Sequence, residues 1–128
     1  MNRPISPTVH GALDYSTMAA ALAAPRVLDF PKSAALATYS LAASYLALSA
    51  LTDYPPALKR AVPLRVHGAT DVALGFALPL LPWVMGFARE HRARNFFLAL
   101  TGVTMIVTAL TDWQTQRRRR WFWPLGSS

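Results

Sequence analysis

The stretch Val66-His67-Gly68-Ala69-Thr70-Asp71 has a near copy earlier in the chain, Val9-His10-Gly11-Ala12-Leu13-Asp14. In each copy a histidine and an aspartate stand four residues apart inside an otherwise apolar segment. On a helix this spacing places both side chains on one face, one turn apart. Each half also ends in a similar stretch, Leu51-Thr52-Asp53-Tyr54 in the first and Leu110-Thr111-Asp112-Trp113 in the second. The pattern predicts a duplicated helical hairpin that gathers polar residues at one end.

The composition is that of a membrane protein rather than of a soluble domain. Of the 128 residues, 53% are hydrophobic and 15% charged, whereas roughly 25% charged residues are usual in soluble domains. Cysteine is absent, which excludes a disulfide framework, a thiolate metal site and a cysteine nucleophile. The net charge is +7, and the basic residues lie between the apolar runs. This distribution favours attraction to anionic lipid headgroups, and we expect no nucleic-acid partner.

Four apolar segments can be drawn, at about 7–28, 33–53, 63–87 and 95–113. Each is close to the ~20 residues that a helix needs to cross a bilayer. Polar and apolar residues do not alternate with period two, so helices are expected rather than the strands of a closed barrel. The first segment carries His10 and Asp14 where a signal peptide would be purely apolar, so we interpret it as a helix of the mature protein. The predicted fold is all-α, a polytopic membrane four-helix bundle.

The two halves align along most of their length. Nine residues between Val9 and Phe30 recur 57 positions later, and five between Leu41 and Asp53 recur 59 positions later. Repeat one is expected at about 5–55 and repeat two at about 62–114, within a single domain of residues 1–120. An even number of spans per repeat predicts parallel repeats, related by an axis along the membrane normal. Residues 115–128 form a basic and aromatic tail, whose last three residues, 126–128, resemble a cloning remnant.

Lysine and arginine are unequally divided between the two expected membrane faces. Eight lie on the side of the two termini and the central loop, against five on the other side, which favours cytoplasmic termini. Four of the eight form a run that we interpret as an anchor for topology and lipid binding: Arg117, Arg118, Arg119 and Arg120.

The topology predicts one polar cluster near the cytoplasmic face. The first two histidines and four of the six acids belong to the repeated motifs and fall at helix ends on the same side. Asp53 and Asp112 lie at the negative ends of helices, so each needs a partner such as a histidine, Arg65, a cation or a proton. The predicted cation ligands are His10, Asp14, Asp53, His67, Asp71 and Asp112.

Hydroxyl side chains continue from this cluster along two helix faces. Such stripes either bond backbone carbonyls and hold helices together, or line a hydrated path. Gly11 and Gly68 are expected to allow close helix packing. The predicted supporting track consists of Tyr45, Ser49, Thr52, Thr104, Thr108 and Thr111.

The end of each first helix resembles the motif of a known family. The second copy reads Leu81-Pro82-Trp83-Val84-Met85-Gly86-Phe87, and the first copy, Ala24-Pro25-Arg26-Val27-Leu28-Asp29-Phe30, keeps the proline and the final phenylalanine. Together with His-Gly-x-x-Asp, this is similar to the SPW-repeat membrane proteins. The resemblance implies a small bacterial or archaeal protein of the cell (inner) membrane with two helix pairs. It implies no reaction, substrate or cofactor.

Three functional hypotheses follow. The cluster binds a cation, either a proton or a divalent metal such as Mn, Fe or Zn, for transport or sensing. Alternatively it is an interhelical hydrogen-bond network in an accessory subunit of a homo-oligomer or a larger membrane complex. A b-type haem between His10 and His67 is disfavoured, because each histidine has an adjacent aspartate and little apolar space. No nucleophile–base pair, phosphate loop or dinucleotide fingerprint indicates an enzyme.

Overall fold

A computed structural model describes residues 3–114, and in this range the chain is helical apart from its loops and two isolated β-bridges. The all-α prediction is therefore confirmed for the described residues. The arginine run at 117–120, the tryptophans beyond it and the proposed remnant lie outside this range. The helices are α1 (Pro7–Val27), α2 (Lys32–Leu51), α3 (Leu64–Ala77), the 3₁₀ turn η1 (Leu78–Leu80), α4 (Leu81–Val84) and α5 (His91–Leu110).

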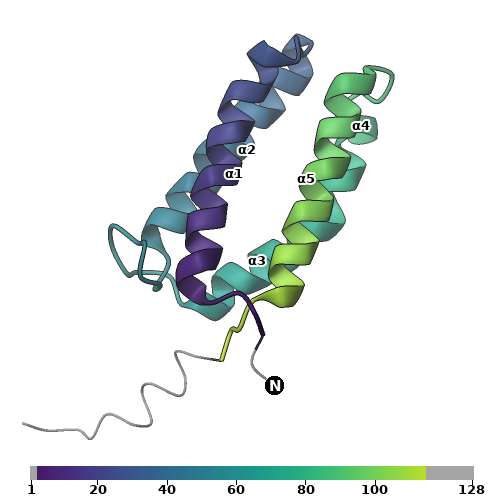
Figure 1. Ribbon diagram of the computed structural model, residues 1–128. Coiled ribbons are helices and arrows are strands. Elements are labelled where there is room, and N and C mark those ends of the chain that lie inside the picture. Colours follow the sequence, from purple (N-terminus) through teal and green to yellow (C-terminus); the bar gives the residue numbers. More distant parts are fainter. Residues whose placement is uncertain (1–2, 115–128) are drawn as a thin grey trace, which may run out of the picture.

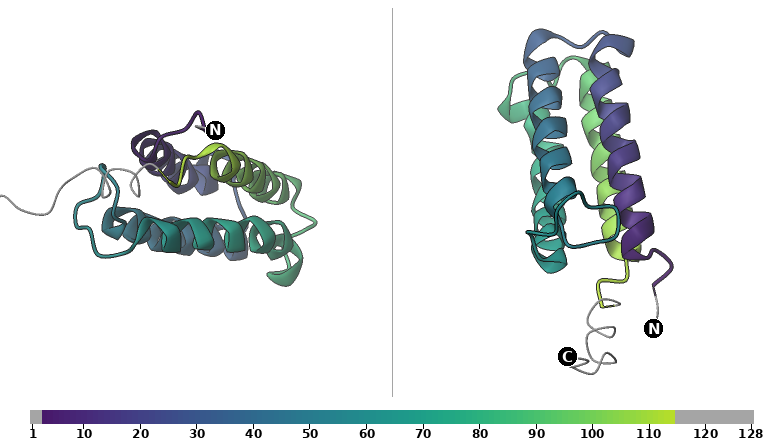
Figure 2. Two further views of the ribbon diagram at one scale, coloured as in Figure 1. Left: turned by 90° about the horizontal axis from the view of Figure 1, so that it is seen from below. Right: turned by 90° about the vertical axis from the view of Figure 1, so that its left-hand side faces the viewer.

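The helices form two hairpins that meet at one end. α1 packs chiefly on α2, and α3 packs chiefly on α5. The starts of α1 and α3 and the ends of α2 and α5 all lie at the lower end of the molecule in Figure 1. Seen from that end, α1 lies beside α5 and α2 beside α3 (Figure 2). The predicted arrangement of two hairpins with the same direction is thus present, and it brings the four motif ends together.

Proline residues begin and end several of these helices. Pro7 is the first residue of α1, where Ser6 caps the helix by accepting a hydrogen bond from Val9 N at 3.2 Å. A proline at this position loses nothing, because its missing N–H would have no partner within the helix. Pro63 holds the equivalent N-cap position of α3. Pro25 lies in the last turn of α1, which ends at Val27.

The third apolar segment is not one continuous helix. α3 ends at Ala77 after 14 residues, and the chain continues as the 3₁₀ turn and the short α4. Pro79 and Pro82 cause this change, because each lacks the N–H that an α-helix requires. The expected helix over 63–87 is therefore corrected to three shorter elements.

The core combines small residues with a cluster of aromatic rings. Ala21, Ala34 and Ala42 are fully buried and let α1 and α2 approach closely. At the end away from the motifs, four phenylalanine rings pack with centroids 5.3–5.7 Å apart and connect the two hairpins. These rings belong to Phe30, Phe87, Phe96 and Phe97.

Within residues 3–114, two helices are long and apolar enough to cross a membrane, α2 and α5, each with 20 residues. This is fewer than the four spans expected from the sequence. One reason is the break after Ala77, since the 14 residues of α3 fall short of the ~20 required. Large apolar side chains are nevertheless exposed on all four long helices, among them Val27, Leu36, Phe76 and Ile106.

Candidate cation site

His10, Asp14, His67 and Asp71 meet in the interior where the two hairpins join. In both α1 and α3 the histidine is the fourth helical residue and the aspartate the eighth. All four side chains are buried, the histidines completely. The repeated motif thus presents the same two groups from each hairpin, at the same depth, to a shared centre.

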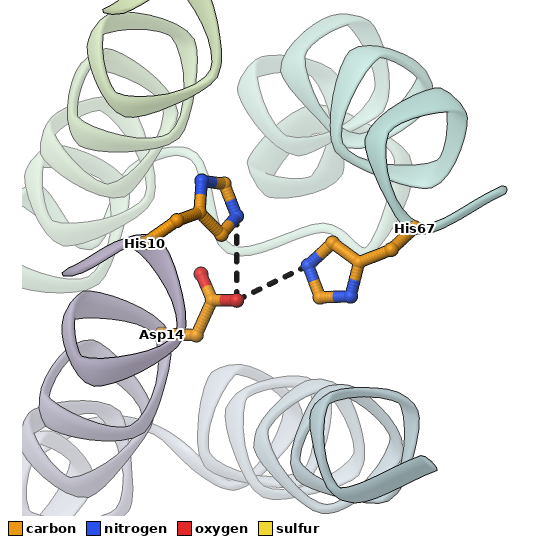
Figure 3. Close-up of side chains that lie close together, drawn as sticks. All are labelled: His10, Asp14 and His67. Carbon is orange, nitrogen blue, oxygen red and sulfur yellow. Dashed lines mark ion pairs between the residues drawn. The ribbon is translucent and has the colours of Figure 1, made fainter. Parts of the chain in front are cut away.

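Both imidazoles turn their Nε2 atoms toward the carboxylates. Asp14 Oδ2 lies 3.3 Å from His10 Nε2 and 3.1 Å from His67 Nε2 (Figure 3). Asp71 lies 3.1 Å from His10 Nε2 through Oδ2 and 3.6 Å from His67 Nε2 through Oδ1. Ligand atoms of His10, Asp14 and His67 all lie within 4.8 Å of one another, close enough for one metal ion to bind all three.

The other ring nitrogen of each histidine contacts a threonine of the opposite hairpin. His10 Nδ1 lies 2.7 Å from Thr111 Oγ1, and His67 Nδ1 lies 2.8 Å from Thr52 Oγ1. Each hydroxyl donates its own proton to the carbonyl four residues earlier, at 2.6 Å for Thr111 and 2.7 Å for Thr52. Because a hydroxyl has only one proton to donate, each threonine must accept from Nδ1–H. The threonines therefore set the tautomer, and the proton of a neutral imidazole resides on Nδ1.

Two tyrosines donate to the carboxylates. The Tyr45 hydroxyl lies 2.5 Å from Asp71 Oδ1, 3.2 Å from Asp14 Oδ1 and 3.0 Å from His67 Nε2. Tyr54 donates to Asp14 Oδ2 at 3.3 Å. Burial raises the pKa of the Tyr54 phenol, so this group stays protonated and keeps its hydrogen bond at neutral pH.

An aromatic ring covers each imidazole, and a glycine makes room for it. The Trp113 ring packs on His10 with centroids 4.9 Å apart, and Tyr54 packs on His67 at 5.4 Å. A Cβ atom at Gly68 would lie 3.2 Å from the Trp113 ring, and one at Gly11 would lie 3.0 Å from Tyr54 and 2.6 Å from Pro56. The expectation that both glycines permit tight packing is confirmed.

Backbone bridges repeat the same symmetry. Ile5 N donates to Leu110 O at 3.1 Å, and Asp112 N donates to Ile5 O at 2.7 Å. In the other half, Val62 N donates to Leu51 O and Asp53 N to Val62 O, both at 2.7 Å. The segment before each first helix is thereby paired with the segment after a second helix, which holds each Thr-Asp pair in place.

Asp53 and Asp112 occupy a different position from the other four predicted ligands. Asp53 Oδ1 lies 3.8 Å from Arg60 Nε, and Asp112 Oδ1 accepts a hydrogen bond from Gln114 N. The helices end one residue before each Thr-Asp pair, and both threonines have extended backbone angles. Neighbouring side chains of an extended chain point to opposite sides, so the threonine turns inward and the aspartate away from it. A ligand role for Asp53 and Asp112 gains no support from this geometry.

The predicted polar track is divided among three roles. Tyr45, Thr52 and Thr111 belong to the cluster itself, and Ser49 is buried next to it. Thr104 and Thr108 line a cavity beside His10. The contacts of Tyr54 and Trp113 with the imidazoles were not predicted from the sequence. The signal that could have revealed them is the aromatic residue that follows both Thr-Asp pairs.

A haem between the two histidines does not fit. The imidazole centroids lie 5.4 Å apart, and the Asp14 carboxylate contacts Nε2 of both rings. The carboxylate therefore occupies the place that a porphyrin between two axial histidines would need.

Comparison with protein-family models, with curated proteins and with solved structures finds no match for this chain. The function is therefore argued from the chemistry of the site.

Proposed function

We propose that this protein is a small membrane protein that binds a divalent transition metal ion between its two hairpins. The ligands are Nε2 of His10 and His67 and one carboxylate oxygen of Asp14, whose ligand atoms lie within 4.8 Å of one another, and the Asp71 carboxylate beside them contributes to the charge balance. Imidazole and carboxylate donors together suit Zn, Fe or Mn. Thr52 and Thr111 act as outer partners that fix the orientation of the two rings, as hydrogen-bond acceptors at Nδ1 do in many metal sites.

The observation that carries this proposal is the convergence of buried imidazole and carboxylate ligand atoms from opposite hairpins. With Nδ1–H donated to threonine, Nε2 of each neutral imidazole is the nitrogen left to bind an ion, and carboxylate oxygens lie 3.1–3.6 Å from it. Ligand atoms about 2.0 Å from a tetrahedral metal lie about 3.3 Å from one another, and Asp14 Oδ2 lies 3.3 and 3.1 Å from the two Nε2 atoms.

Charge balance supports the same conclusion. Two carboxylates carry a charge of −2, and a divalent ion bound with neutral imidazoles makes the group neutral. A buried group with net charge would be costly in an apolar interior. A divalent cation therefore satisfies the geometry and the charge of the cluster together.

A location in the membrane rests on the distribution of apolar and basic residues. α2 and α5 have the length and composition of spans, and the long helices expose large apolar side chains. Basic residues gather at the two ends of the hairpins, near Arg60 at one end and Arg92 at the other. The resemblance to the SPW-repeat family favours four spans in a bacterial or archaeal inner membrane, and the unequal division of lysine and arginine favours cytoplasmic termini.

A second candidate is a hydrogen-bond network that fastens the hairpins of an accessory subunit. Two protons in place of the metal, one on each Nε2, would also neutralise the carboxylates. This alternative is favoured by Tyr45, whose hydroxyl already joins Asp71, Asp14 and His67. Metal analysis separates the two proposals, because only the first requires a bound ion.

The test is the metal content and Zn²⁺ affinity of the detergent-purified protein. We expect one ion per chain in the unchanged protein, and loss of binding in the double variant H10Q/H67Q. The matched control is H91Q, because His91 is an exposed histidine at the start of α5, at the opposite end of the hairpins. Absence of binding in the unchanged protein and in H91Q, or unchanged affinity in H10Q/H67Q, would contradict the metal site.

A further inference from the structure

The two hairpins place side chains of very different size at one pair of equivalent positions near the cluster. Tyr45 in α2 and Thr104 in α5 are equivalent by the repeat offset of 59. On the α2 side the tyrosine hydroxyl reaches Asp71 and His67. On the α5 side the shorter threonine lines a cavity instead. The symmetry of the site is therefore broken at this position, where a cavity lies beside His10 and Thr104.

This cavity has the size and the polar lining for one water molecule. Its volume is about 20 Å³ and its wall includes His10, Asp14, Asp71, Thr104 and Thr108. A cavity of roughly 10–15 Å³ or more with two to four polar partners can hold a water. The rest of the wall is largely apolar and comes mainly from α1 and α5, which lie side by side in Figure 2, and Val103 of that wall is 44% exposed.

Two buried polar atoms on this wall have no hydrogen-bond partner within residues 3–114, His10 Nε2 and Thr108 Oγ1. The carboxylates near His10 Nε2 are 3.1 and 3.3 Å away but are not hydrogen-bonded to it. Buried polar atoms without partners are costly, and they commonly mark the place of a water or an ion. Both atoms belong to residues that border the same small cavity.

We infer that the cavity is an open coordination position of the bound metal, which takes one exchangeable water-sized ligand from the cleft between α1 and α5. The inference rests on the proposed metal site. Metal sites that keep one position open to water are typical of centres that exchange ligands, whereas closed sites are structural. Thr108 Oγ1 supplies a hydrogen-bond partner to the ligand, and Tyr45 closes the equivalent position on the α2 side.

The test fills the cavity and measures water exchange at a paramagnetic ion. T104Y places in α5 the residue that α2 already carries, and V107F fills the same cavity from a neighbouring position. T104V is the matched control, because valine has the shape of threonine and leaves the space open. Each protein is loaded with Mn²⁺, its bound metal is counted by equilibrium dialysis, and the relaxation of bulk water protons is recorded.

We expect one bound Mn²⁺ in all four proteins. The relaxation enhancement from metal-bound water should be present in the unchanged protein and T104V, and lost in T104Y and V107F. Equal enhancement in all four, with Mn²⁺ bound, would overturn the open position and leave the metal site standing. Failure of the unchanged protein to hold either Mn²⁺ or Zn²⁺ would instead contradict the proposed function, and the inference with it.

Discussion

Two threonine hydroxyls determine which nitrogen of each imidazole is available. Thr52 and Thr111 accept from Nδ1–H of the histidine in the opposite hairpin, since each donates its own proton to a helix carbonyl. Each histidine is therefore oriented by the hairpin to which it does not belong. The proposed metal ligands are correctly placed only when both hairpins are in position.

The first prediction concerns these hydroxyls. The double variant T52V/T111V should fold but bind Zn²⁺ about 10–100-fold more weakly, because loss of such an outer partner frees the ring and its tautomer. T101V is the control, since the buried Thr101 hydroxyl donates to Phe97 O at 2.8 Å in the same way but belongs to another part of α5. Competition with a chromophoric chelator gives the affinities. Equal affinity in T52V/T111V and T101V would refute the role of the hydroxyls.

The glycines give a second prediction at the same scale. G11A should lower the free energy of unfolding by about 1–3 kcal/mol, as overpacking does, because its Cβ would lie 2.6 Å from Pro56. G68A should have a smaller effect, with its nearest contact at 3.2 Å. Nothing lies within 4 Å of a Cβ at Gly102, so G102A should stabilise α5 by up to about 1 kcal/mol. Thermal unfolding in detergent would show the order, and a G11A protein as stable as G102A would count against it.

The ends of the helices, rather than their middles, join the hairpins. Ile5 lies shortly before α1, and Val62 lies shortly before α3. Each forms two backbone hydrogen bonds with the chain where the second helix of a repeat ends. Ile5 connects the two hairpins, whereas Val62 pairs within the first repeat and its connecting loop. The second helix of each repeat ends before its Thr-Asp pair. The chain is extended there, these bridges hold it in that form, and the threonine side chain turns inward.

A third prediction tests the bridge at Ile5. I5P removes the N–H that donates to Leu110 O, whereas I5A keeps it. A typical backbone hydrogen bond contributes about 1 kcal/mol. The Asp112 amide pairs with Ile5 O, so we expect it to exchange with deuterium about fivefold faster in I5P. Exchange followed by mass spectrometry makes the comparison. Equal rates in I5P and I5A would show that the bridge does not hold the end of α5.

At the scale of the whole molecule, the outer surface is apolar and the interior polar at one end. Apolar side chains such as Phe76 (68% exposed) and Ile106 (61% exposed) face outward, while the two histidines are fully buried. A surrounding bilayer would cover the first set, and the metal would balance the charge of the second.

The fourth prediction tests the bilayer. I106K places a charge on the outer face of α5 and should weaken membrane insertion by about 2.5–3.5 kcal/mol, the cost of a lysine at the centre of a span. L58K is the control, because Leu58 is 90% exposed in the loop between α2 and α3. Alkaline extraction of membranes would measure the retained fraction. A membrane location would be contradicted if the unchanged protein were soluble and I106K were retained to the same extent as L58K.

Much of this architecture is visible in the sequence. The repeated apolar segments predicted helices, because composition and periodicity are local properties. The repeat offset predicted that the two His-Asp pairs would share one depth, and the structure joins them. The lengths of the spans were less predictable, since Pro79 and Pro82 break the third segment into α3, η1 and α4.

The remaining features depend on contacts between hairpins. The helical pattern placed Asp53 and Asp112 toward the cluster, but the helices end one residue before Thr52 and Thr111, and the extended backbone turns the threonines inward instead. The cavity beside Thr104 is likewise evident only in the structure, where the Thr104 side of the site can be compared with the Tyr45 side. The sequence alone determined the helices and the spacing of the ligands along each of them, because these follow from local order. Which hydroxyls orient the imidazoles, and which side of the site stays open, was decided by the tertiary structure, because both depend on residues from opposite hairpins meeting at one point.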